Sequence, residues 1–460
     1  METYVTDKIE HIGKRDVAWS YASAIFMVGA GLILLPFILH TMQAETVYLW
    51  NIFQGITALV LLLDFGFRPS FARNVSYIFS GVKHLQVEGV ERIDDLAAEV
   101  DYSLLKSSLR AMKRFYGWMA LVVLIVLATA GTAYFLYILS RYSGDKQDAL
   151  WAWGLLILIN CYNLYTFYYD ALLTGKGYIK RSQQITILGQ TIYILVAIGL
   201  LYAGGGLVSI VAAQLLSTLV RRVLAFRVFF TKELKQKLRE AKDTDSQQSP
   251  QEVLRAISPN AIKIGLTGLG GFLVQKSALL LGGVYIPLAT MASYGITLQV
   301  MDILVRCSEV FYQSYTPKLA QCRAEGNLKL LKHYYKLSIG SLVLIFVMGG
   351  IGWIFLGDWA LNLIKSDTHF VSTSMLIALL VINLLEHNHS VSAGFIMADN
   401  KIPFFIPSLL SGAATLLLLW LLLGPMQMGM WALVIAPGLA QLAYQNWKWP
   451  SVVIRELKNV

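Results

Sequence analysis

The sequence predicts an all-α polytopic membrane protein with twelve transmembrane helices. Of its 460 residues, 56% are hydrophobic and only 14% are charged, and the mean hydropathy is +0.58. Soluble globular proteins carry about 25% charged residues. The chain also contains repeated apolar windows of the roughly 20 residues that a helix needs to cross a bilayer. Composition and window length therefore exclude a soluble globular protein.

The apolar windows pair into six short hairpins, with six windows on each side of one polar segment. The first six cover approximately residues 17–40, 47–68, 116–140, 149–173, 183–203 and 207–230, and the second six cover 259–282, 289–316, 337–357, 370–396, 404–424 and 430–447. The segment between the two sets, 231–250, holds clustered basic residues followed by a polar DTDSQQSP stretch. This linker predicts an N-terminal six-helix bundle over 1–243 and a C-terminal six-helix bundle over 244–460.

Lysine and arginine are distributed unevenly among the loops. The loops that join an even-numbered span to the next odd one, together with both termini, hold nearly all of them, and the opposite loops hold only Arg141, Lys146 and Lys365. Positive residues accumulate on the cytoplasmic side of short loops, so both termini are expected in the cytoplasm. The basic residues behind the net charge of +10 are thus interpreted as signals of orientation, and nucleic acid is not an expected partner. The longest inner loop is predicted over 74–113, and its acidic run between Glu88 and Glu99 is interpreted as a solvated face.

Short motifs close several of the spans. Span two ends in LDFGF-x-P over 63–69, and span four ends in LLTGK over 172–176. The segment FRPSFAR at 67–73 shares the pattern aromatic-x-Pro-x-apolar-Ala-polar with YTPKLAQ at 315–321 in the second half. This similarity suggests an internal repeat. With these motifs and its two sets of six spans, the chain resembles the multidrug/oligosaccharidyl-lipid/polysaccharide exporter superfamily and, within it, the bacterial O-antigen and polysaccharide flippases. The loop 74–113 is longer and more charged than the usual inner connection of that family.

The resemblance implies two six-helix bundles around a central cavity that opens alternately to either face of the bacterial inner membrane. It implies as cargo an undecaprenyl-pyrophosphate-linked oligosaccharide, the repeat unit of an O-antigen, capsule or exopolysaccharide. It implies no cofactor other than a coupling proton or sodium ion. The expected partners are the lipid-linked oligosaccharide, the lipid bilayer and other polysaccharide-assembly proteins, and the expected state is a monomer.

Five polar residues of span eight recur at helical spacing: Gln299, Asp302, Arg306, Glu309 and Gln313. Steps of three and four place them on one helical face. An ionised side chain at mid-bilayer costs about 2.5–3.5 kcal/mol on insertion scales, so such residues face protein or a water-filled cavity. We expect this polar stripe to line the cavity, with Arg306 binding pyrophosphate through its planar fork of donors. The alternative is a structural zipper against a neighbouring helix. The spacing also permits Asp302 and Glu309 to pair with Arg306 on the same helix.

Two further spans supply candidate cargo-binding cations. Lys276 lies in span seven about 10 Å from its outer end, and snorkelling towards the interface is the alternative. Arg68 and Arg73 flank Pro69 at the inner mouth of span two and are expected to receive the pyrophosphate, although Arg73 equally fits a positive-inside anchor. The same face of span two also carries Gln54, Thr57 and Asp64. We interpret Asp64 chiefly as a partner of Arg68 and secondly as an ion-coupling group.

Span ten holds the densest polar cluster within an apolar run, between Asn383 and Ser390. Glu386 and His387 are candidates for binding a coupling proton, because histidine titrates near neutral pH and intramembrane carboxylates relay protons. His387 and His389 are two residues apart and thus lie on different helix faces, whereas a helical zinc pair is spaced by four. No metal site is therefore expected.

Other functions fit this sequence less well. A proton- or sodium-coupled multidrug antiporter of the same superfamily is expected to have a cavity dominated by carboxylates and aromatic rings, and Arg68, Lys276 and Arg306 count against it. A membrane-embedded glycosyltransferase or glycan polymerase usually has a sizeable outer loop or an acidic metal-binding cluster. A non-catalytic scaffold for glycan-assembly enzymes is a further alternative. The chain contains no Gly-Lys-Ser or Gly-Lys-Thr of a Walker motif, so a secondary transporter is predicted rather than an enzyme.

Overall fold

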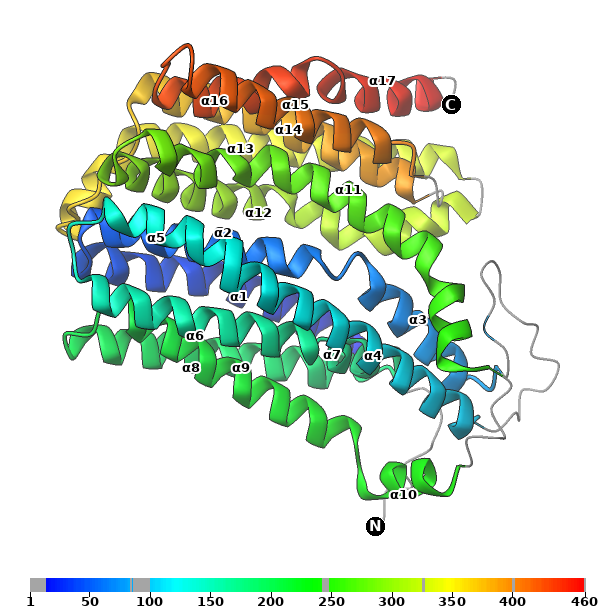
Figure 1. Cartoon of the computed structure of the whole chain (residues 1–460). Coiled ribbons are helices and arrows are strands. Elements are labelled where there is room, and N and C mark those ends of the chain that lie inside the picture. Colours follow the sequence, from blue (N-terminus) through cyan, green and yellow to red (C-terminus); the bar gives the residue numbers. More distant parts are fainter. Residues whose placement is uncertain are drawn as a thin grey trace. The chain divides into compact units, whose positions relative to one another are not determined.

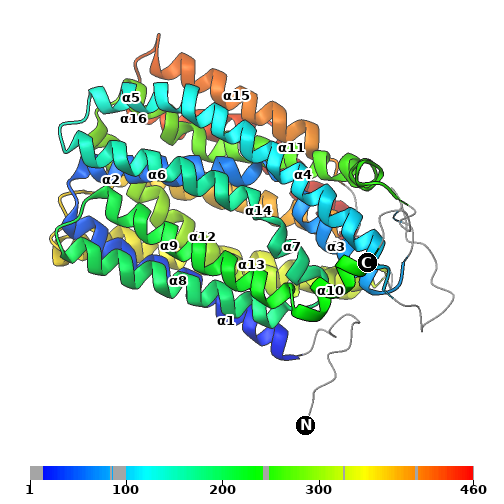
Figure 2. The same ribbon diagram turned by 60° about the horizontal axis from the view of Figure 1, so that its bottom comes forward.

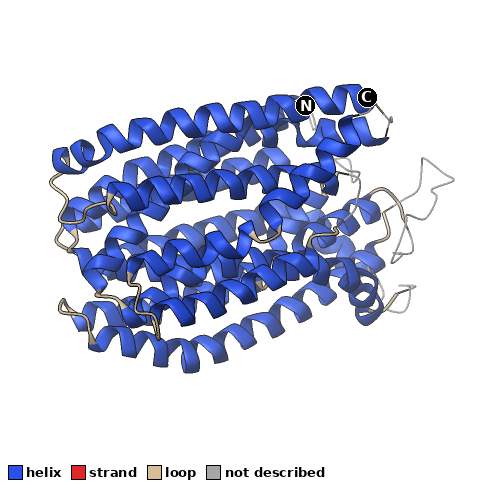
Figure 3. Ribbon diagram, turned by 90° about the horizontal axis from the view of Figure 1, so that it is seen from above, coloured by secondary structure: helices blue, strands red, loops and turns tan. Residues whose placement is uncertain are grey.

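The regular secondary structure is entirely helical in the part of the chain that the computed structural model describes, namely residues 14–82, 85, 100–241, 248–324, 327–398 and 402–458 (Figures 1 and 3). The helices of the first half are α1 (Lys14–Thr41), α2 (Ala44–Leu62), α3 (Phe67–Phe79), α4 (Tyr102–Val126), the π-helical turn η1 (Leu127–Gly131), α5 (Thr132–Ser140), α6 (Lys146–Tyr165), α7 (Tyr168–Gly175), α8 (Ile179–Tyr202), α9 (Leu207–Phe229) and α10 (Lys232–Glu240). The helices of the second half are α11 (Pro250–Tyr285), α12 (Leu288–Ala324), α13 (Leu328–Leu363), α14 (Thr373–Met397), α15 (Phe405–Leu423), α16 (Met430–Leu442) and α17 (Gln445–Lys458).

Eleven helical spans within these described residues are long and apolar enough to cross a membrane. They correspond to the first eleven predicted spans, so the polytopic all-α architecture is confirmed. The twelfth predicted span, 430–447, is divided between α16 and α17, which meet at the turn around Ala443 and Tyr444. At about 1.5 Å per residue, the 13 residues of α16 are too short to cross a bilayer core of about 30 Å.

Contacts divide the chain into two compact units. Unit 1 comprises residues 1–34, 57–137 and 147–265, and unit 2 comprises 35–56, 138–146 and 266–460. The contact boundary therefore passes through α1 and α2, and the segment 138–146 groups with the C-terminal half. The division into bundles at 1–243 and 244–460 stays a prediction from sequence.

Two connections in the first half of the chain differ from the expected spans. Span two ends at Leu62, and the chain turns through Phe65 and Gly66, which have positive φ angles of 47° and 71°, before α3 begins. The break thus precedes Pro69, which lies in the first turn of α3, where its missing N–H costs no helical hydrogen bond. The predicted loop 74–113 is helical at both ends, since α3 continues to Phe79 and α4 begins at Tyr102. Its acidic run lies outside the described residues.

Capping side chains explain where two of these helices begin. Asp101 precedes α4, and its carboxylate accepts hydrogen bonds from the backbone N–H groups of Ser103 and Leu104, both at 2.9 Å. Thr231 precedes α10 and accepts from the N–H of Leu234 at 3.2 Å. Such caps satisfy N–H groups that have no partner inside the helix. The predicted linker 231–250 therefore contains an ordered helix directly after α9.

Packing within each unit joins consecutive helices and also helices that are distant in sequence. In unit 1, α8 packs along α9, α3 packs against α7, and α10 contacts α4. In unit 2, α12 packs along α13, and α14 contacts α13, α16 and α17. The core of the latter contains Leu331, Phe395 and Trp449. These contacts place polar side chains of different helices opposite one another.

Candidate functional site

Side chains of the polar stripe of α12 contact residues on three other helices within unit 2. The Nζ atom of Lys276 on α11 lies 2.8 Å from Oδ2 of Asp302. The Nδ1 atom of His387 on α14 lies 2.7 Å from Oε1 of Glu309. The side-chain amide of Gln299 donates to Asn51 on α2. Three residues of the stripe thus contact neighbouring helices, and the lining of a transport cavity by the stripe stays a prediction.

Arg306 has neither of the intrahelical partners that its spacing allows. It is exposed, and within the described part of the chain no ion pair or hydrogen bond of its guanidinium group is found, because Asp302 is held by Lys276 and Glu309 by His387. Gln313, four residues beyond Glu309, is also exposed and reaches its carboxylate at 3.4 Å. Arg306 is therefore a mid-helix cation available to an external anion.

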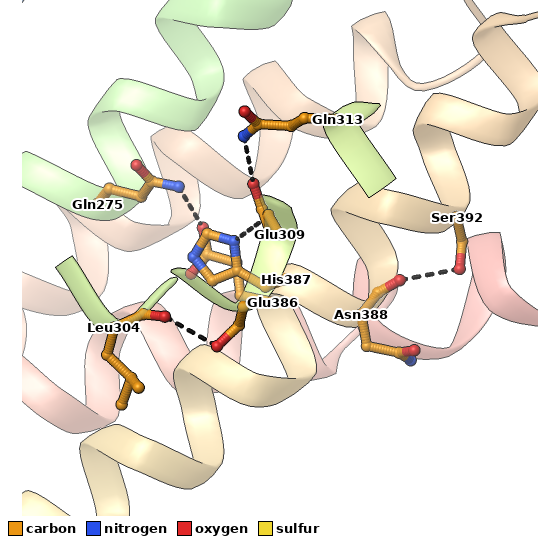
Figure 4. Close-up of polar contacts among 9 residues, drawn as sticks. Gln275, Leu304, Glu309, Gln313, Glu386, His387, Asn388 and Ser392 are labelled. Carbon is orange, nitrogen blue, oxygen red and sulfur yellow. Dashed lines mark hydrogen bonds and ion pairs between the residues drawn. The ribbon is translucent and has the colours of Figure 1, made fainter. Parts of the chain in front are cut away.

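Figure 4 shows how the polar cluster of α14 meets α11 and α12. Glu386 is buried, 5% exposed, and its Oε1 accepts a hydrogen bond from Nε2 of Gln275 at 2.9 Å. His389 has a partner different from that of His387, as their spacing predicts, and its Nδ1 lies 2.8 Å from Oδ1 of Asn446. Glu386 and His389 line a pocket of about 240 Å³, together with the buried Gln441, whose Oε1 has no hydrogen-bond partner in the described part of the chain.

Unit 1 contains a separate cluster around the turn that follows α2. The Asp64 carboxylate accepts a hydrogen bond from the hydroxyl of Tyr116 at 2.5 Å and from the backbone N–H of Arg68 at 3.1 and 3.2 Å. Asp64 thus caps α3, and no ion pair between its carboxylate and the Arg68 guanidinium is found among the described residues. Because Asp64 is buried, desolvation raises the pKa of its carboxyl, while the hydrogen bonds from Tyr116 and Arg68 act in the opposite direction.

The guanidinium group of Arg68 stacks instead on the ring of Phe167, with 4.6 Å between the guanidinium carbon and the ring centroid. Arg222 of α9 approaches the same ring at 5.7 Å. Arg222 is 5% exposed and forms an ion pair of 2.9 Å with Asp170 of α7, while its other terminal nitrogen donates to Asn163. Its Nε is buried, with no hydrogen-bond partner among the described residues.

These side chains open onto a pocket of about 650 Å³ in unit 1, which we call the arginine pocket. Its lining includes Arg68, Arg221, Arg222, Asp64 and Asp170. The two aspartates are already engaged by the contacts described above. Neither Arg68 nor Arg221 has an ion-pair partner among the described residues. The pocket thus presents two guanidinium groups that no contacting carboxylate of the described chain neutralises.

Gly189 allows the close approach of Arg221, one of the three arginines of the arginine pocket. A methyl group at Gly189 of α8 would overlap Cγ and Cδ of Arg221. The absence of a side chain at Gly189 therefore lets the stem of Arg221 cross α8 closely. No spacing rule in the sequence predicts this contact.

The structure brings only some of the sequence-predicted site residues together. Arg68 and Asp64 share the arginine pocket of unit 1, whereas Arg73 is exposed and is not among its described lining. Gln54 is an exposed residue of unit 2. Sequence reasoning did not single out Tyr116 or the two arginines of α9 as site residues. The signal that identifies Arg221 and Arg222 is their position inside the apolar window 207–230 rather than after it.

The arrangement of helices in this chain is similar to that of several solved transporters, one of which is described as a member of the MOP superfamily. An inward-facing multidrug resistance MATE family transporter of that superfamily is similar to this chain with a TM-score of 0.66 at 16% sequence identity, over 95% of this chain and 96% of the transporter. The MATE multidrug transporter DinF-BH is similar with a TM-score of 0.64 at 15% identity, over 99% of this chain and 97% of that transporter.

A third similar structure is the lipid II flippase MurJ in an inward closed conformation. Its TM-score is 0.62 at 11% identity, over 96% of this chain and 87% of the flippase. No family model and no curated protein matches the sequence. The expected fold class is therefore confirmed, and it is a fold found in both drug transporters and a lipid flippase.

Proposed function

We propose that this chain is a flippase, a secondary transporter that moves an undecaprenyl-pyrophosphate-linked oligosaccharide across the bacterial inner membrane by alternating access. The cargo is the repeat unit of an O-antigen, capsule or exopolysaccharide, and both termini lie in the cytoplasm. The observation that carries the proposal is the arginine pocket, where Arg68 and Arg221 lack ion-pair partners among the described residues.

Pyrophosphate matches the chemistry of this pocket. A guanidinium group presents donors in a planar fork that fits phosphate oxygens bidentately. Stacking of Arg68 on Phe167 holds its guanidinium group in place while leaving its N–H edge available. In unit 2, Arg306 supplies a further cation without a carboxylate partner in the described chain.

The experiment that tests the proposal is reconstitution into vesicles, where transfer of a fluorescent polyprenyl-pyrophosphate oligosaccharide between leaflets is followed. Arg68→Gln, Arg221→Gln and Arg306→Gln are compared with Arg455→Gln, which removes an exposed cation of α17. We expect the first three to slow transfer by about tenfold or more, because each removes a charge-assisted contact, and the control to transfer normally. Equal rates in all four variants would contradict the proposal.

A second candidate function is a proton- or sodium-coupled multidrug antiporter. The observation that favours it is the buried carboxylate of Glu386 in its pocket of about 240 Å³, together with the fold shared with MATE transporters. In vesicles that carry a proton or sodium gradient, this function predicts efflux of a cationic dye that Glu386→Gln abolishes. Dye efflux without lipid transfer would favour the antiporter.

Ion coupling is proposed for Glu386, His387 and Asp64 in either function. His387 and Glu309 form a contact that spans α14 and α12, so gain or loss of a proton there changes the attraction between two helices. Asp64 holds the turn between α2 and α3. Proton or sodium movement that accompanies cargo transfer is the corresponding measurement.

A further inference from the structure

A second pocket of unit 1 lies at the end of the membrane spans, between α4, α7, α9 and α10. Its volume is about 380 Å³, which is within the range of about 300–1,000 Å³ that is typical of small-molecule sites. Figures 1 and 2 show α10 at the end of α9, beside the beginning of α4. We call this the interfacial pocket, and it is distinct from the arginine pocket, with which it shares no described lining residue.

Five cations line the interfacial pocket: Lys106, Arg110, Lys113, Lys235 and Arg239. The three from α4 are spaced by four and three residues and the two from α10 by four, so each helix directs one face to the pocket. The described lining contains no carboxylate. The pocket therefore has a strongly basic wall without an acidic residue of its own in the described chain.

Aromatic rings form the floor beneath these cations. Phe226 and Phe230 lie 4.9 Å apart between ring centroids, and Tyr169 contacts both at 5.9 and 6.4 Å. The ammonium group of Lys235 lies 4.9 Å above the Phe226 ring. Phe226 is 37% exposed although it belongs to a membrane span, so the floor is partly open.

The position of α10 is fixed by contacts with α4. Nζ of Lys106 donates to the backbone carbonyl of Ala241 at 2.8 Å, and Lys237 lies 5.3 Å above the ring of Tyr102. The apolar span of α9 ends at Phe229, and α10 follows with Leu234 buried and Lys235 and Arg239 exposed. An amphipathic basic helix directly after a membrane span lies at the level of lipid headgroups.

We propose that the interfacial pocket binds the headgroup of an anionic phospholipid from the leaflet at this end of the spans. The phosphodiester is held by Lys113, Lys235 and Arg239, and the glycerol and the first acyl carbons lie on the aromatic floor. Charge complementarity and the open aromatic floor both favour a lipid over a soluble anion, since a soluble anion makes no use of apolar rings. The site is independent of the transported cargo.

The test is native mass spectrometry of the full chain titrated with phosphatidylglycerol or phosphatidylcholine. The Lys113→Gln/Lys235→Gln/Arg239→Gln variant is compared with Lys329→Gln/Lys336→Gln/Arg455→Gln, which removes three exposed cations elsewhere and changes the net charge equally. We expect the pocket variant to weaken phosphatidylglycerol binding by more than about tenfold, because each cation near an anionic surface contributes on the order of fivefold. The control should bind as the native chain does.

Three outcomes would overturn the assignment. The two triple variants could lose phosphatidylglycerol binding equally, the pocket variant could bind phosphatidylglycerol as the native chain does, or the native chain could bind phosphatidylcholine as strongly as phosphatidylglycerol. A separate titration uses inorganic pyrophosphate. If it binds at the pocket and phosphatidylglycerol does not, the pocket serves a soluble or cargo pyrophosphate and the lipid proposal is wrong.

Circular dichroism and thermal unfolding establish that the triple variants are folded. The single charge reversal Lys113→Glu gives a milder change, and we expect it to weaken phosphatidylglycerol binding in the same direction. Undiminished lipid binding in Lys113→Glu would also contradict the proposal. Transfer of the polyprenyl-pyrophosphate oligosaccharide is measured separately, in vesicles of phosphatidylcholine alone. Because these vesicles contain no phosphatidylglycerol, this assay tests the cargo site, and failure of one proposal leaves the other testable.

Discussion

Lys276 of α11 and Asp302 of α12 form an ion pair, with 2.8 Å between Nζ and Oδ2. The Asp302 side chain is 53% exposed and that of Lys276 is 23% exposed. Because Asp302 pairs with Lys276, it does not pair with Arg306, the partner on its own helix that an i,i+4 spacing allows. Two cations that look equivalent in the sequence therefore differ in their contacts: Lys276 has an ion-pair partner on a second helix, and Arg306 has none among the described residues.

Arg306 and Lys276 should accordingly respond differently to neutralisation. Arg306→Gln is expected to reduce cargo transfer by about tenfold while leaving the midpoint of thermal unfolding unchanged, because it removes a charge-assisted contact to cargo and no described partner. Lys276→Gln is expected to lower stability slightly, by on the order of 0.5 kcal/mol, since exposed ion pairs contribute little. Transfer assays and thermal unfolding in the same detergent measure both effects. A large loss of stability in Arg306→Gln would show that its role is structural.

Arg222 should be the arginine of unit 1 on which stability depends most. Arg222→Gln leaves Asp170 without its ion-pair partner, and we expect a loss on the order of 2–3 kcal/mol, less than for a fully buried pair because the Asp170 side chain is 34% exposed. Denaturant unfolding measures this loss. Arg221→Gln is the matched control on the preceding residue and should cost less, because no ion pair of Arg221 is found in the described chain. Equal losses would contradict the distinction.

Gly189 provides a way to move Arg221 without removing its charge. In Gly189→Ala the new methyl group displaces the Arg221 stem, whose Cγ and Cδ it would otherwise overlap. Because the contacted atoms belong to a flexible side chain, we expect cargo transfer to fall several-fold with only a small change in stability. Gly199→Ala, on the same helix with no neighbouring atom within 4 Å, is the control. Normal transfer in Gly189→Ala would indicate that the position of Arg221 is unimportant.

The close approach of α3 and α7 should be sensitive to a single methyl group. A Cβ at Gly175 would lie 2.5 Å from the backbone oxygen of Ala72 and from Cβ of Val75, and backbone atoms do not move aside as a side chain does. We expect Gly175→Ala to destabilise the protein by about 1–3 kcal/mol through overpacking. Gly154→Ala, at an open position, should have little effect. Unfolding free energies of the two variants decide the matter.

The contact between His387 and Glu309 should link transport to proton binding. His387→Asn keeps a polar side chain but removes a titrating group, so the dependence of transfer on a pH gradient is expected to be reduced while binding of cargo is kept. Proton uptake recorded with a pH-sensitive dye inside the vesicles measures this directly. Undiminished proton movement in His387→Asn would place the coupling group elsewhere, with Glu386→Gln as the next variant.

The sequence by itself determined the helical membrane architecture and most of the spans, because apolar windows of bilayer length leave few other structures open to the backbone. It also determined that the polar residues of α12 share one face, since helical periodicity is a local property. It misplaced the ends of helices where capping and turns decide: α4 begins at Tyr102 after the Asp101 cap, and α2 ends before the turn at Phe65 and Gly66.

Only the tertiary structure decided which polar side chains meet. Asp64 is engaged by Tyr116, 52 residues away, and Arg222 by Asp170 on another helix. Spacing along one helix cannot give such pairs, because an i,i+4 neighbour is always near, whereas a partner on a second helix depends on how the two helices pack. The arginine pocket follows from the same cause: its cations come from α3 and α9, which are distant in sequence, and packing of both helices against α7 brings them to one place.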